Sequence, residues 1–130
     1  IGIYISDEVN RVLGIDMSTS SINNALDNRE LNNIKNVEFV CSKVEDYIDK
    51  IIGKHDLVIV DPPRAGLDKK TVEYLKKISS YGIVYISCDP ATMARDLREL
   101  SDTYKVVSIK PFNMFPKTYH CESISVLERK

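Results

Sequence analysis

Asp16, Asp61 and Cys88 each stand at the end of a short apolar run, where an α/β protein commonly presents its reactive side chains. Ligands of open α/β sheets bind outside the carboxyl ends of the strands. A carboxylate at such a position can accept hydrogen bonds from a ligand, and a thiol can act as a nucleophile. These three residues are therefore the first candidates for a functional site.

Cys88 has the most informative setting of the three, because it lies in a Ser-Cys-Asp-Pro sequence. Asp89 is a good N-cap and Pro90 suits the first helical position, so a helix is expected to begin just after the thiol. The helix macrodipole and free N–H groups there would favour the thiolate. A buried, inert thiol is the alternative, and it is our interpretation of Cys41 and Cys121, which lack this context.

The elements that must position these residues alternate between short apolar runs and segments of helical periodicity. This alternation predicts an α/β fold with a mostly parallel sheet. Strands are expected at Val12–Ile15, Val37–Val40, Asp56–Val60 and Ile83–Ser87, followed by an antiparallel edge hairpin near 104–109 and 121–128. Helices are expected at about 20–32 and from Ser42, which opens an S-x-x-E capping box, to Gly53. Two more are expected at Lys70–Ser80, with Gly82 just beyond, and from Pro90; their inward stripes would be Val72, Leu75 and Ile78, and Met93, Leu97 and Leu100. The Asp56–Val60 run is expected to be buried on both faces.

Composition narrows the class of protein. The 130 residues predict one domain, and 43% hydrophobic with 28% charged residues is ordinary for a globular protein. A net charge of −1 argues against a strongly basic nucleic-acid module, although RNA binding stays open because another domain can carry the basic surface. No apolar run approaches the roughly 20 residues of a membrane span. Three widely spaced cysteines predict a reduced, cytoplasmic protein without a metal site.

Three motifs then follow in order: D-P-P-R-A-G at Asp61–Gly66, S-C-D-P-A-T at Ser87–Thr92 and F-P-K-T-Y-H-C-E at Phe115–Glu122. Together they resemble the signature motifs of the uracil-carbon-5 RNA methyltransferase family, and the resemblance covers essentially the whole chain. It implies a class I (Rossmann-like) α/β methyltransferase sheet with a C-terminal antiparallel hairpin. It also implies S-adenosyl-L-methionine as the cofactor, no metal, and rRNA or tRNA as the partner.

By that resemblance, Cys88 is the nucleophile that attacks the uracil ring and Glu122 is the base that removes the carbon-5 proton. Asp61 matches the family residue between the cofactor and the target base, and Asp16 matches the acidic residue that holds the ribose hydroxyls of the cofactor. Each carboxylate also has a structural alternative. Glu122 would be an exposed strand residue, Asp61 a turn residue before two prolines, and Asp16 a helix cap.

The chain also departs from the family pattern, which begins with a strand and a Gly-rich turn. Ile1–Ser6 resembles only the helix after that turn. We therefore expect residues 1–130 to be the C-terminal part of the catalytic domain, with the first strand and the Gly-rich loop missing. Any iron–sulfur cluster would lie outside this chain. Two unpaired sheet edges would invite self-association, and the 130 residues alone are expected to bind the cofactor weakly and to be inactive on RNA.

Two other functions stay open at this point. An amino-group methyltransferase can use a D-P-P turn without a covalent step, although Arg64 stands where such enzymes usually carry an aromatic residue. A non-catalytic RNA-binding or scaffold domain is the second alternative. The sequence leaves two roles open for Arg95 and Lys117, which are contact with RNA phosphate and pairing with neighbours such as Glu99. The motifs do not identify the RNA or the uridine.

Overall fold

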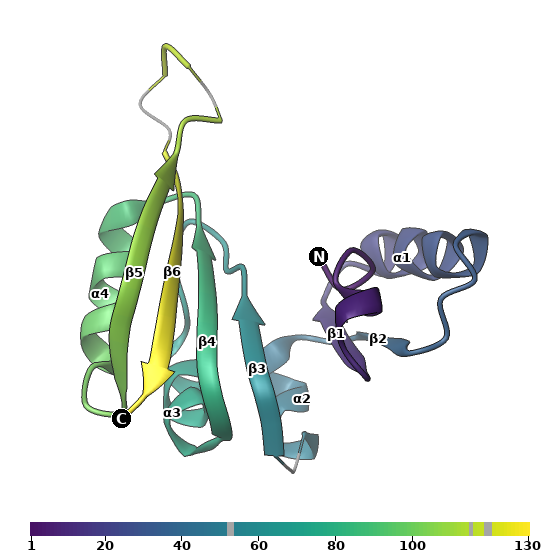
Figure 1. Ribbon diagram of the computed structural model, residues 1–130, viewed down its shortest axis with the longest axis horizontal. Helices are drawn as coiled ribbons and strands as arrows, with labels where there is room; N and C mark the ends of the chain where they lie inside the picture. The colour runs from purple at the N-terminus through teal and green to yellow at the C-terminus, as the bar shows by residue number, and fades with distance from the viewer. Residues whose placement is uncertain (52–53, 115, 119–120) are drawn as a thin grey trace. The chain divides into compact units, whose positions relative to one another are not determined.

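The computed structural model describes residues 1–51, 54–114, 116–118 and 121–130 (Figure 1). The chain separates into two compact units, residues 1–51 and residues 52–130. Each unit is described by itself below. No helix in the described part of the chain is long and apolar enough to cross a membrane.

The first unit is built on a two-stranded parallel sheet of β1 (Val12–Asp16) and β2 (Val37–Cys41). The helix α1 (Thr19–Leu31) connects the two strands, and a short 3₁₀ helix, η1 (Ser6–Glu8), precedes them. The Ser18 hydroxyl oxygen accepts a hydrogen bond from the Ser21 N–H and thereby caps α1. The predicted strands and helix are confirmed here to within one residue at each end.

The predicted helix from Ser42 to Gly53 is wrong in its length and its cap. The structure has one turn of α-helix, α2 (Val44–Tyr47), followed by the 3₁₀ helix η2 (Ile48–Lys50). Lys43 is the N-cap and makes no side-chain capping bond, while the Ser42 hydroxyl donates to the Lys43 carbonyl instead. The hydroxyl therefore bonds its own neighbour and leaves the predicted capping box unformed. Gly53, the predicted stop, lies outside the described residues.

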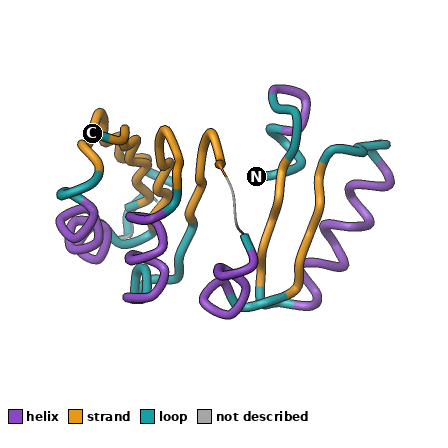
Figure 2. Tube along the Cα trace, turned by 90° about the horizontal axis from the view of Figure 1, so that it is seen from below, coloured by secondary structure: helices purple, strands orange, loops and turns teal. Residues whose placement is uncertain are grey.

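Among the described residues, the second unit forms a four-stranded sheet in the order β3-β4-β6-β5. Its strands are β3 (Lys54–Val60), β4 (Ser79–Ser87), β5 (Tyr104–Phe112) and β6 (Glu122–Arg129). β3 and β4 are parallel, whereas β6 runs antiparallel to both β4 and β5. The predicted hairpin is confirmed, with β5 at the edge. Helices α3 (Lys69–Lys77) and α4 (Pro90–Leu100) cover the same face of this sheet (Figures 1 and 2).

The core of the second unit lies between that face and the two helices. Its buried members are Val72, Leu75, Ile83, Tyr85, Met93, Leu97, Leu100, Tyr104 and Leu127. The helical spacing seen in the sequence predicted the inward stripes of α3 and α4 correctly. Burial of this many apolar side chains is what holds α4, and the residues just before it, in a fixed place on the sheet.

Two further expectations about the second unit are wrong. Gly82 does not follow the end of α3, because α3 ends at Lys77 and Gly82 lies inside β4. A Cβ at Gly82 would lie 2.7 Å from the carbonyl oxygen of Leu127 on β6, so the glycine permits a close strand approach. Nor is the β3 run buried on both faces, since Leu57 is 52% exposed. Within the described residues β3 pairs only with β4, and β1 only with β2, so each keeps the unpaired edge that was predicted.

Candidate active site

Three of the predicted site residues lie at the same end of the sheet in the second unit, the end where β3 and β4 finish and β6 begins. Asp61 follows β3 and Cys88 follows β4, and because these strands are parallel their carboxyl ends lie at that end. β6 runs antiparallel to β4 and begins there with Glu122. The last pair in the β4–β6 register is Ser87 with Ser123, so Cys88 and Glu122 are the next residues along each strand at the same level. Residues far apart in the sequence are thus brought together.

Cys88 is a half-buried free thiol between the end of β4 and the start of α4. The Ser87 hydroxyl donates to the Asp89 carbonyl oxygen at 2.9 Å and accepts from the Asp89 N–H at 3.0 Å. These two bonds form a tight turn around the thiol. Asp89 is the N-cap and Pro90 the first residue of α4, as predicted. The backbone on both sides of Cys88 is therefore held by local hydrogen bonds.

The sequence suggested that free N–H groups at the start of α4 would stabilise a Cys88 thiolate. In the structure two of these N–H groups donate to Asp89 instead. Asp89 Oδ1 accepts from the N–H groups of Ala91 and Thr92 at 3.0 and 3.1 Å, and Pro90 has no N–H to offer. The bond from the Thr92 N–H, followed by that from Ala91, lowers the pKa of Asp89 below its ordinary value of 3.8. A charged carboxylate thus occupies the positive end of the helix.

The loop that carries Asp61 is fastened to α4. Within it the Gly66 N–H donates to the Pro63 carbonyl at 2.8 Å, closing a turn in which Gly66 has a φ of 80°. The Thr92 hydroxyl donates to the Arg64 carbonyl, and Arg95 Nη2 donates to the Ala65 carbonyl at 2.8 Å.

Arg95 also pairs with Asp96 at 2.7 Å. Of the two roles left open for it, pairing with a neighbour is therefore the one observed, with Asp96 as the partner. Sequence analysis missed Asp96. Its signal was an acidic residue at an inward position of the α4 stripe.

The remaining members of the third motif are described in part. Glu122 is half-buried and pairs with Phe112 of β5 in the antiparallel register. Lys117 is exposed and has a φ of 69°, in the left-handed region that few residues other than glycine adopt. Phe115, Tyr119 and His120 lie outside the described residues.

Asp16 ends β1 in the first unit, with an exposed side chain. Its Oδ1 atom accepts from the Ser18 N–H at 2.7 Å, and Ser18 rather than Asp16 caps α1. Asp16 is therefore not the N-cap, but its carboxylate does make a local structural bond at the start of α1. A carboxylate has about four acceptor positions. The bond to Ser18 therefore leaves further acceptor positions on the Asp16 carboxylate.

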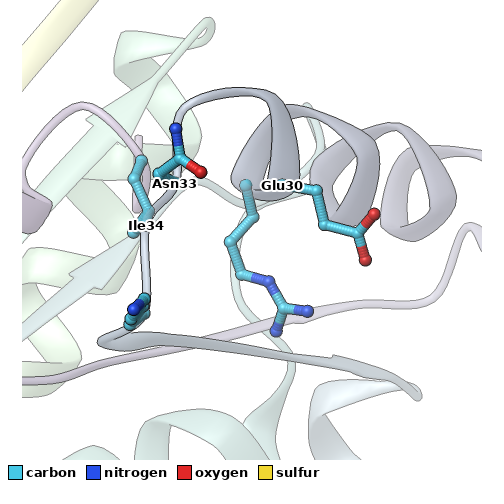
Figure 3. A pocket seen from close by; sticks show the side chains of 5 residues that line it. Glu30, Asn33 and Ile34 are labelled. Carbon is cyan, nitrogen blue, oxygen red and sulfur yellow. The ribbon is translucent and has the colours of Figure 1, made fainter.

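A pocket of about 420 Å³ lies at the other end of α1 (Figure 3). Its lining consists of Arg29, Glu30, Asn33, Ile34 and Lys35. None of the predicted site residues lines it, and α1 separates it from Asp16 by about 20 Å at 1.5 Å per residue. The candidate residues at the strand ends, Asp16, Asp61, Cys88 and Glu122, therefore do not belong to this pocket.

The structure superimposes on solved methyltransferase structures. The tRNA (uracil-54, C5)-methyltransferase of Pyrococcus abyssi, in complex with S-adenosyl-L-homocysteine, superimposes with a TM-score of 0.85 at 38% identity, covering 97% of this chain and 31% of that chain. TrmK of M. capricolum, in complex with S-adenosyl-homocysteine, superimposes with a TM-score of 0.73 at 16% identity, over 98% of this chain and 56% of that one. The predicted class I α/β methyltransferase fold is confirmed.

The family is shown by sequence. A family model described as tRNA (Uracil-5-)-methyltransferase matches residues 1–130. An uncharacterized RNA methyltransferase of Caldanaerobacter subterraneus is 41% identical over 133 aligned residues, covering 99% of this chain. One of Clostridium tetani is 37% identical over 131 residues and covers the whole chain. The chain belongs to the tRNA (uracil-5-)-methyltransferase family. It spans 29% of the length of both curated relatives.

Proposed function

We propose that the chain, both units together, is the C-terminal part of the catalytic domain of an RNA methyltransferase that converts uridine to 5-methyluridine in rRNA or tRNA. The observation that carries the proposal is the set of side chains at the ends of β3 and β4 and at the start of β6. A thiol, Cys88, and a carboxylate, Glu122, occupy adjacent strand ends, and a second carboxylate, Asp61, follows the neighbouring strand. Family membership supports the same reaction.

The chemistry explains why a thiol and a carboxylate are needed side by side. Carbon 5 of uracil is too weak a nucleophile to take a methyl group directly. In the proposed reaction Cys88 Sγ bonds to carbon 6, and the electrons of the carbon 5–carbon 6 double bond move onto carbon 5 and the adjacent carbonyl. Carbon 5 then attacks the methyl group of a sulfonium donor, the methyl–sulfur bond breaks, and the donor leaves as a neutral thioether. Glu122 removes the proton from carbon 5, the double bond re-forms and the thiolate leaves.

S-adenosyl-L-methionine would supply the electrophilic methyl group. Asp16 is the residue we assign to its ribose hydroxyls, since an exposed carboxylate at a strand end can accept from two adjacent donors. Asp61 would accept from the uracil N3–H or orient the methionine end of the cofactor. The rigid Pro62-Pro63 pair after it suits a wall against a planar base. The base must leave its stack to reach these strand ends.

The assignment of the nucleophile is tested by trapping the adduct. Fluorine at carbon 5 cannot leave as a proton does, so RNA containing 5-fluorouridine should remain bonded to the enzyme after methyl transfer. The protein as its gene encodes it is mixed with the cofactor and with substituted tRNA or rRNA. We expect an RNA–protein adduct that is lost in Cys88→Ala and kept in the control variants Cys41→Ala and Cys121→Ala. An adduct that persists in Cys88→Ala would show that the nucleophile is another residue.

The same assay separates the alternatives. An amino-group methyltransferase would transfer methyl groups in the Cys88→Ala variant at nearly the unmodified rate, and would form no adduct. A scaffold or RNA-binding domain would bind RNA without transferring methyl groups. We further propose a cytoplasmic enzyme, since a catalytic thiol must stay reduced.

The 130 residues alone are proposed to bind the cofactor weakly, to be inactive and to self-associate. Support comes from the unpaired edges of β1 and β3, which belong to two separate sheets in the described residues. Isothermal titration of the isolated 130-residue chain with S-adenosyl-L-methionine checks the first point. Tight binding would overturn it.

A further inference from the structure

The Asp96 carboxylate is buried on α4, next to the proposed active site but not part of it. Only 1% of the residue is exposed. Its Oδ2 atom accepts from the Tyr85 hydroxyl at 2.6 Å and from the Leu67 N–H at 2.7 Å. Its Oδ1 atom accepts from Nε and Nη2 of Arg95, at 2.9 and 2.7 Å. We call Leu67, Tyr85, Arg95 and Asp96 the Asp96 cluster.

These bonds join three separate segments of the chain. Leu67 belongs to the loop that begins with Asp61, and Tyr85 lies on β4 three residues before Cys88. Arg95 and Asp96 lie on α4, whose N-cap directly follows Cys88. Arg95 also bonds this loop, by donating to the Ala65 carbonyl. The cluster therefore links the segment that carries Asp61 to both elements that flank Cys88.

The donors match the charge of the acceptor. Burial, and after it the hydrogen bond to Asp96, raises the pKa of Tyr85, so this hydroxyl keeps its proton and remains a donor. The hydrogen bond to Asp96 likewise raises the pKa of Arg95. Each carboxylate oxygen has two donors among the described residues, as a buried anion requires.

Stability alone does not explain a charge at this position. Replacing a buried ion pair with apolar residues of similar volume is often neutral or stabilising. An apolar residue at position 96 would also continue the inward stripe of Met93, Leu97 and Leu100. What an apolar side chain lacks is directional bonds, and these fix the loop in one place on β4 and α4.

We propose that Asp96 is a positioning residue, which holds the loop carrying Asp61 in register with the end of β4 that carries Cys88. The inference rests on the proposed function, because the register matters for catalysis only if the two residues act on one substrate. Misplacing a reacting group by about 1 Å can lower a rate on the order of a hundredfold.

The second unit offers a matched pair of variants for the test. Tyr85 and Tyr104 are both buried, at 0% and 1% exposure. The Tyr85 hydroxyl donates to Asp96, whereas the Tyr104 hydroxyl donates to the Leu75 carbonyl at 2.8 Å, outside the cluster. Tyr85→Phe and Tyr104→Phe each remove one buried hydroxyl without changing the packed ring. Only the first weakens the Asp96 cluster.

Steady-state kinetics of the protein as its gene encodes it should separate the pair. At a temperature where both variants are folded, we expect Tyr85→Phe to lower kcat by roughly ten- to a hundredfold, with the KM for RNA changed by less than about twofold. Adduct formation with 5-fluorouridine RNA should slow by a similar factor. Tyr104→Phe should keep kcat within about twofold of the unmodified value. Equal kcat in the two variants would overturn the positioning role.

A second readout does not depend on methyl transfer. Since the Leu67 N–H donates to Asp96, its hydrogen exchange should be about tenfold faster in Tyr85→Phe and unchanged in Tyr104→Phe. Unchanged exchange at Leu67 in Tyr85→Phe would overturn the proposal whatever the activity. If the unmodified protein methylates no uridine but the Leu67 amide responds as expected, the link between the segments stands and the proposed function fails.

Discussion

Gly66→Ala is expected to destabilise the second unit strongly, because two separate costs fall on one methyl group. Gly66 has a φ of 80°, and an L residue in the left-handed region costs about 1–2 kcal/mol. The new Cβ would also lie 2.5 Å from Arg95 Nη2 and 2.5 Å from Asp96 Oδ2. Asp96 is buried and cannot swing away, so relieving the overlap means losing a hydrogen bond to a charged group, worth about 1.5–3 kcal/mol. Together these give a loss of about 2.5–5 kcal/mol.

Urea unfolding followed by far-ultraviolet circular dichroism measures this loss. Gly2→Ala is the control, since a Cβ there would lie 3.1 Å from a Val12 methyl and at ordinary contact distances, 3.8 and 3.9 Å, from Val37 and Phe39. It should cost less than about 1 kcal/mol. Gly66→Asn separates the two causes, because Asn tolerates the left-handed region better but carries the same Cβ. We expect it to recover at most about 1 kcal/mol. The reasoning is refuted if Gly66→Ala costs no more than Gly2→Ala, or if Gly66→Asn is nearly as stable as the unmodified chain.

Three other variants test separate parts of the account. The pKa of Asp89 is lowered in the folded state, so its stabilising contribution is fully present above its ordinary value of 3.8 and is lost as the pH falls below 3.8 through the folded-state pKa. Asp89→Asn keeps the cap and should make the loss of stability in this acidic range shallower in urea titrations. Leu75→Ala, in the core at 2% exposure, should cost about 2–5 kcal/mol, whereas Leu31→Ala, 79% exposed, should cost less than about 0.5 kcal/mol. Asp16→Asn should lower the affinity of the gene-encoded protein for S-adenosyl-L-homocysteine, measured by isothermal titration calorimetry, at least about tenfold. Asp27→Asn on α1 should leave this affinity unchanged. Equal affinities of the two variants would contradict the assignment of Asp16.

Periodicity predicted most of the fold, because burial against a sheet imposes it. The stripe of Val72, Leu75 and Ile78 is buried as expected, and so is that of Met93, Leu97 and Leu100. The failures occurred where a short-range contact competes with the pattern. Ser42 bonds its neighbour instead of capping a helix, and Gly82 serves a strand contact instead of ending α3. Neither contact can be read from residue spacing.

The sequence predicted which site residues follow a strand, but not which strand ends lie beside each other. Cys88 and Asp61 follow parallel strands, and the β4–β6 register then brings Glu122 to the same end of the sheet. The register itself depends on long-range pairing that a sequence does not reveal. For the same reason the Asp96 cluster was missed, since its donors Leu67 and Tyr85 are 29 and 11 residues away in the chain. A lone acidic residue within an apolar stripe signals that a partner exists but does not identify it.

Loss of hydrogen from carbon 5 of uridine tests the central claim most directly. RNA labelled with tritium at carbon 5 of its uridines is incubated with the gene-encoded protein and S-adenosyl-L-methionine, and released tritium is counted against methyl groups transferred. The account predicts one tritium released for each methyl group, and neither event in the Cys88→Ala variant. Methyl transfer without release of tritium would contradict methylation at carbon 5.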